Sequence, residues 1–75
     1  MPWTYTMPDG RQIHVTTFGT KVRWAILAGF GYGEITGISN KESGGRLRAL
    51  LAWRDSTNAR AIPVEALAAA EREAA

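Results

Sequence analysis

The side chains with the clearest capacity for binding chemistry are four arginines in the second half of the chain. Arg46, Arg48 and Arg54 recur at even spacing along an alternating segment, and Arg60 follows shortly after. A two-residue period is typical of a β-strand and places alternate side chains on one face. Because guanidinium groups form paired hydrogen bonds with phosphate oxygens, this strand face predicts binding of an anionic partner, most simply nucleic acid.

The distribution of charge agrees with an anionic partner. The formal net charge is +2, but residues up to Val64 include eight basic and four acidic side chains, a balance of +4. From Glu65 onward the balance is −2. A basic body suits nucleic acid or a phosphate-bearing ligand. The alternative is a solvated arginine face that serves solubility or pairs with Glu34 and Glu42.

Residue types that support catalysis or metal binding are scarce. The chain has no cysteine and a single histidine, His14, which argues against thiolate and histidine-based metal sites. Glycines at 29, 31 and 33 lack the spacing of the dinucleotide-binding fingerprint, and a strand rather than a helix is expected to follow them. We therefore predict no catalytic residue, no metal and no cofactor.

Length and composition indicate one small domain, residues 1–75. The chain is 45% hydrophobic and 21% charged, as in globular proteins. No apolar run approaches the ~20 residues that span a bilayer, and no secretory signal is evident, so a cytoplasmic location is expected. A core this small usually needs added support, and without disulfide or metal the remaining sources are self-association or an unusually well-packed small fold.

The first half of the chain predicts strands. Residues 3–7 and 12–17 alternate in polarity around the turn-forming sequence Pro8-Asp9-Gly10, which indicates a β-hairpin. A further strand is expected to start at residues 21–24, the short apolar run 25–28 fits a helix or a strand, and another strand is expected at 34–39. Residues 40–45 are polar, end in two glycines and predict a loop.

The second half is ambiguous at its most informative segment. Residues 46–54 fit a strand or a helix, and we favour a strand because two glycines precede it and a turn sequence follows at 55–58. A last short strand is expected at 59–62 and a helix at 64–73. The residues expected inside the fold are Ile35, Leu47, Leu51, Trp53 and Ile62.

Many short strands with glycine-rich turns predict an all-β fold. The expected architecture is a small SH3-like barrel at residues 18–63. An N-terminal hairpin at residues 1–17 precedes it, and a short helical tail at 64–75 follows it.

Three segments resemble a known family. They are Phe18-Gly19-Thr20-Lys21-Val22-Arg23, Gly33-Glu34-Ile35-Thr36-Gly37 and Ile62-Pro63-Val64-Glu65-Ala66-Leu67. Together they are similar to the SH3-like barrel pattern, and most similar to the plasmid-borne type II dihydrofolate reductases, over residues 18–68.

The resemblance implies a homotetramer with a central pore that binds NADPH and dihydrofolate. The pore motif of that family, Val-Gln-Ile-Tyr after a serine, corresponds to residues 58–62 of this chain. These residues are Asn58, Ala59, Arg60, Ala61 and Ile62. The glutamine amide and the tyrosine hydroxyl that would orient the bound rings are absent here, so the family's active-site motif is not retained.

Three functions therefore follow from the sequence. We favour a non-enzymatic SH3-like module that binds nucleic acid through Arg46, Arg48, Arg54 and Arg60. One alternative is a reductase-like oligomer that reduces dihydrofolate with NADPH at residues 58–62. The other is a plasmid- or phage-type interaction factor that docks on a protein through the free edge of the N-terminal hairpin.

Overall fold

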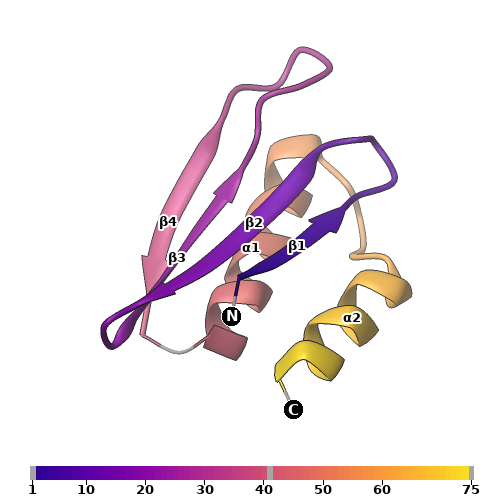
Figure 1. Cartoon of the computed structure of the whole chain (residues 1–75). Helices are drawn as coiled ribbons and strands as arrows, with labels where there is room; N and C mark the ends of the chain where they lie inside the picture. Colours follow the sequence, from indigo (N-terminus) through magenta and orange to yellow (C-terminus); the bar gives the residue numbers. More distant parts are fainter. Residues whose placement is uncertain (1, 41, 75) are drawn as a thin grey trace.

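The computed structural model describes residues 2–40 and 42–74, and these form an open antiparallel sheet followed by two helices (Figure 1). The strands are β1 (Trp3–Thr6), β2 (Gln12–Phe18), β3 (Lys21–Ile26) and β4 (Ile35–Ser39). The helices are α1 (Glu42–Thr57) and α2 (Val64–Ala74).

The sheet has the strand order β1-β2-β3-β4, so each strand pairs with its neighbour in sequence. The predicted N-terminal hairpin is confirmed, with Trp3 opposite Val15 and Tyr5 opposite Ile13. The second hairpin turns at Gly19 and Thr20, so Phe18 lies opposite Lys21. The third extends to Phe30 and Gly31, which both have positive φ, as the central residues of a type I′ turn do.

The predicted all-β barrel is wrong. The described residues form an α+β fold with an open sheet, and no closed barrel is present among them. Residues 18–63, assigned above to a barrel, contain the end of β2, strands β3 and β4 and the whole of α1. The C-terminal helix does begin at Val64 as predicted, and Ala75 lies outside the described residues.

Helix α1 replaces the strand expected at residues 46–54, and it also covers residues 42–45, which were expected to be a loop. Lys41 of that loop lies outside the described residues. The buried residues of α1 include Arg46, Ala49, Leu50 and Trp53, which follow the i, i+3, i+4, i+7 spacing of a helix. Leu47, expected inside, is 46% exposed because the helix turns it away from the core.

The core lies between one face of the sheet and both helices. The sheet contributes Trp3, Met7, Ile13, Val15, Val22 and Ile26; α1 contributes Ala49, Leu50 and Trp53; α2 contributes Ala66, Ala69 and Ala70. Of the residues predicted inside, Trp53 is buried, whereas Ile35, Leu51 and Ile62 are half-buried. Because both helices pack on the same side, the opposite face of the sheet is left uncovered (Figure 1).

Candidate functional site

The uncovered side of the sheet, here called the open face, is the largest surface that the fold presents without a covering element. It is made by alternate residues of each strand, because side chains of the other parity enter the core. Its members are Thr4, Thr6, Gln12, His14, Thr16, Phe18, Lys21, Arg23, Ala25, Thr36 and Ile38.

The strand register arranges these side chains in rows across the sheet. One row runs from Thr16 through Arg23 to Ile38. The neighbouring row runs from His14 through Ala25 to Thr36. Adjacent strands are ~4.8 Å apart and successive side chains on one face are ~6.6 Å apart, so members of neighbouring rows lie within contact distance of one small ligand group.

The two rows line a shallow hollow of about 740 Å³. The lining includes His14, Phe18 and Arg23, with Ala25 and Thr36 on its floor. Phe18 is 50% exposed and Ile38 is 63% exposed, so both present apolar surface to a ligand. The hollow therefore combines an exposed aromatic ring, a cation and threonine hydroxyl groups on an apolar floor.

The charges of the open face have one sign. None of the four strands contains an aspartate or a glutamate, whereas β3 carries Lys21 and Arg23. The Lys21 ammonium donates to the Oδ1 atom of Asn40 at 2.5 Å. His14 Nε2 lies 3.2 Å from the side-chain oxygen of Gln12. The open face thus offers exposed donors to an anion, and its strands contain no carboxylate; the exposed Glu34 lies just before β4 at the margin of this face.

The four arginines predicted to share a strand face are not brought together. In a helix, residues two apart point to nearly opposite sides, so Arg46 and Arg48 separate. Arg46 is 1% exposed, and its guanidinium carbon lies 5.6 Å from the centroid of the Trp3 ring. Arg48 is exposed on α1, and Arg60 is exposed in the connection between the helices. Sequence reasoning placed them on one surface only because it assumed a strand.

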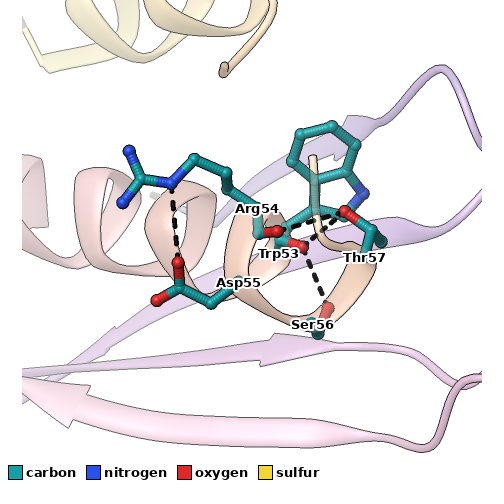
Figure 2. A network of polar contacts seen from close by, with 5 residues as sticks. All are labelled: Trp53, Arg54, Asp55, Ser56 and Thr57. Atoms are coloured by element: carbon teal, nitrogen blue, oxygen red, sulfur yellow. Dashed lines mark hydrogen bonds and ion pairs between the residues drawn. The ribbon is translucent and has the colours of Figure 1, made fainter. Parts of the chain in front are cut away.

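Arg54 belongs to the C-terminal end of α1 (Figure 2). Its Nε atom lies 3.5 Å from Asp55 Oδ1, and its carbonyl accepts the N–H of Ala59 at 3.0 Å. That backbone bond spans six residues around Asn58, whose φ of 57° is the left-handed conformation of a Schellman cap. The hydroxyls of Ser56 and Thr57 each donate to the Trp53 carbonyl at 2.9 Å.

The segment that the family resemblance marked as a pore, residues 58–62, connects α1 to α2 instead of forming a strand. Asn58 and Ala61 are exposed, while Ala59 and Ile62 pack at the margin of the core. Because the described chain forms an open sheet, no barrel strand presents these residues to a central pore.

A buried arginine that the sequence did not single out, Arg11, makes several polar contacts. It is 2% exposed and donates from Nε to the Leu27 carbonyl, from Nη1 to Ser56 Oγ and from Nη2 to the Gly33 carbonyl, at 3.1, 2.9 and 2.7 Å. Its guanidinium also lies 5.1 Å from the centroid of the Tyr32 ring. These contacts join the β3–β4 hairpin to the end of α1.

Neither a metal site nor a membrane span is found in the part of the chain that the structure describes. No group of three or more histidine, cysteine or acidic side chains lies together there. Neither helix has the length and apolar character needed to cross a membrane. Comparison with protein-family models, with curated proteins and with solved structures finds no match for this chain.

Proposed function

We propose that this protein is a non-enzymatic module that binds single-stranded nucleic acid on the open face of its sheet. The observation that carries the proposal is the hollow in which the half-exposed Phe18 ring and the Arg23 guanidinium lie on strands that contain no carboxylate. Aromatic rings stack on bases, and guanidinium groups bind phosphates, so the two groups complement both parts of a nucleotide.

A single strand fits this face better than a duplex. The open face carries only Lys21, Arg23 and the imidazole of His14 as cationic or potentially cationic groups. Duplex binding through the backbone typically involves several phosphate contacts, more than these side chains supply. An apolar floor with one exposed ring instead suits unstacked bases, each contributing ~1–3 kcal/mol on an aromatic side chain.

The proposed partner, nucleic acid, is the one inferred from the sequence, but the proposed binding surface is a different one. The arginines first chosen lie apart on or around α1, whereas the open face is on the opposite side of the sheet. The four threonines on that face add hydroxyl groups that can donate to or accept from base edges and phosphates. A cytoplasmic location belongs to the same proposal, since single-stranded RNA or DNA is accessible there.

Fluorescence anisotropy with a labelled oligonucleotide of about ten nucleotides tests the proposal, with RNA, single-stranded DNA and duplex DNA compared at low salt. We expect F18A and R23A each to weaken binding of the single strand at least about fivefold, in line with loss of one stacking or one phosphate contact. L47A and R48A are the matched controls, since they remove an exposed apolar side chain and an exposed cation from α1.

The controls also separate the two surfaces. If R48A weakens binding as much as R23A does, the open face is not the binding surface. Absence of binding to every oligonucleotide at ~50 mM salt would exclude the function itself, because electrostatic affinity for nucleic acid is greatest at low salt.

A further inference from the structure

The two edges of the sheet differ in how they are protected from pairing with another strand. Edge strand β1 is only four residues long and is flanked by Pro2 and Pro8, which cannot donate a backbone hydrogen bond. Side chains of α2, Ala69 and Arg72, share a small cavity with β1. These are devices that proteins use to block edge-to-edge association.

Edge strand β4 is also short, at five residues, but among the described residues it has neither the flanking prolines nor a shared cavity with a helix. Its sequence, Ile-Thr-Gly-Ile-Ser, contains no proline and no charged residue. β4 ends the strand order, and no other described element lies beyond it (Figure 1). An uncharged edge strand of this kind is a ready template for a further strand.

The register determines which backbone groups of β4 are free. The Leu27 N–H donates to the Gln12 carbonyl, so the backbone N–H and C=O groups of Leu27 point toward β2. Successive residues of a strand direct these groups to alternate sides, so Val22, Trp24 and Ile26 direct theirs toward β4. On β4, the backbone N–H and C=O groups of their partners point back toward β3; these partners are Ile35, Gly37 and Ser39. The N–H and C=O groups of Thr36 and Ile38 therefore point outward from the sheet.

These outward groups are complementary to a second copy of the same strand. In an antiparallel pair with a two-fold axis at Gly37, Thr36 of one copy lies opposite Ile38 of the other. Each such pair exchanges two backbone hydrogen bonds, as residues at hydrogen-bonded positions of an antiparallel ladder do. The same register places Glu34 opposite Asn40, at both ends of the shared ladder.

The charges next to β4 favour this register. Asn40 holds the Lys21 ammonium at 2.5 Å, and both side chains lie on the open-face side of the sheet. Glu34, which is exposed, has the same side-chain parity as Thr36 and Ile38. In the two-fold arrangement the carboxylate of Glu34 therefore faces the Lys21 and Asn40 side chains of the other copy. The symmetry supplies this cross-strand pair of opposite charges twice.

We propose that the protein forms a two-fold homodimer in which the β4 strands of two copies pair antiparallel about Gly37. The two four-stranded sheets become one continuous sheet of eight strands, and the two open faces become one surface. Ile38, now 63% exposed, packs beside Thr36 of the other copy. The inference rests on the edge of the sheet and is independent of nucleic-acid binding.

Sedimentation equilibrium of the whole chain over about 1–500 µM tests the proposal. We expect a concentration-dependent shift from 8.2 kDa to twice that mass. T36P removes an outward N–H at two symmetric positions and should abolish the dimer in this range. T4P is the matched control. The backbone N–H and C=O groups of Trp3 and Tyr5 point toward β2, so the N–H of Thr4 points outward from the β1 edge, on the opposite side of the sheet from β4.

A charge reversal provides a test that leaves the backbone unchanged. E34K should weaken the dimer roughly tenfold, since it replaces two exposed ion pairs with repulsion. The double variant K21E/E34K should restore the dimer to near its original strength. If T36P does not fold by circular dichroism, this charge exchange decides the question.

Three results overturn the proposal. The first is a chain that remains monomeric throughout the concentration range. The second is a dimer that neither T36P nor E34K weakens. The third is a dimer that T4P abolishes and T36P leaves intact, which would place the interface at β1.

Discussion

The guanidinium of Arg11 and the hydroxyl of Ser56, which are 45 positions apart in the chain, meet at 2.9 Å where the β1–β2 turn reaches the end of α1. Ser56 is itself part of the C-terminal cap of the helix, because its hydroxyl donates to the Trp53 carbonyl (Figure 2). The bond therefore joins the helix end to the residue that holds the β3–β4 hairpin. Arg11 is the point at which hairpin, turn and helix are fixed relative to one another.

Replacement of Arg11 by methionine should lower the free energy of unfolding by about 3 kcal/mol. Methionine keeps much of the volume but leaves the Leu27 and Gly33 carbonyls and the Ser56 hydroxyl without the charged donor, and hydrogen bonds to charged groups contribute about 1.5–3 kcal/mol each. Urea unfolding followed by circular dichroism measures the change. Arg48→Met, at an exposed position of α1, is the control and should change stability by less than about 0.5 kcal/mol. Equal losses in the two variants would contradict a structural role for Arg11.

Trp53 and Asp9 should prove energetically coupled. The indole N–H donates to Asp9 Oδ2 at 2.8 Å, while Asp9 Oδ1 accepts the backbone N–H of Arg11 at 3.0 Å. Trp53→Phe removes the donor and should cost about 2 kcal/mol from the lost bond and the smaller ring. In an Asp9→Ala background the same substitution should cost about 1 kcal/mol less. A double-mutant cycle by urea unfolding measures this coupling, and purely additive losses would show that the bond contributes nothing.

Gly45→Ala should destabilise the protein even though alanine is the better helix former. A Cβ atom at this position of α1 would lie 2.5 Å from Val22 Cγ1, so the helix or β3 must shift. Overpacking of this kind costs ~1–3 kcal/mol, against ~1 kcal/mol gained in helix propensity. We expect a net loss of about 1 kcal/mol in chemical denaturation. Gly33→Ala is the control, because nothing lies within 4 Å of the corresponding Cβ. A stabilised Gly45→Ala variant would show that α1 does not approach the sheet so closely.

The salt dependence of single-strand binding should show whether Arg23 contacts a phosphate. For single-stranded nucleic acid each phosphate contact contributes ~0.7 to the slope of log K against log salt concentration. R23A should therefore reduce the magnitude of this slope by about 0.7, whereas F18A should lower the affinity without changing it. An anisotropy titration at four or five salt concentrations measures both slopes. If the slope changed in F18A and not in R23A, Arg23 would not be a phosphate contact.

The strands in the first half of the chain could be predicted because the alternation of polar and apolar residues there matches which side chains are buried in the fold. The hairpin at Trp3–Thr6 and Gln12–Phe18 has alternating polarity around a proline- and glycine-containing turn, and both signals act over a few residues. Residues 21–24 were predicted to start a strand, and the apolar residues 25–28 fitted a helix or a strand; the strand continues to Ile26. The open face follows from the same alternation, once the sheet is known to be covered on one side only.

The helix at Glu42–Thr57 was missed because its buried stripe does not look apolar. Two members of that stripe, Arg46 and Ala49, are charged or small, while Leu47 is exposed. Glycine near the start argued for a turn, but Gly45 is required by close packing against Val22. The packing of Gly45 against Val22 joins residues far apart in the sequence, so the neighbouring sequence does not predict it. The same is true of the burial of Arg46 against Trp3. The error moved the arginine site, because a strand and a helix place residues 46, 48 and 54 on different faces.

The order of the elements along the chain has a consequence for synthesis. All four strands precede both helices, so the ribosome synthesises every residue of the sheet before the residues that cover it. At about 5–20 residues per second, synthesis of α1 takes roughly one to three seconds. The core residues Ile13, Val15, Val22 and Ile26 therefore lack their helical partners until α1 has been made, and the hydrophobic core can be completed only once the helices are available.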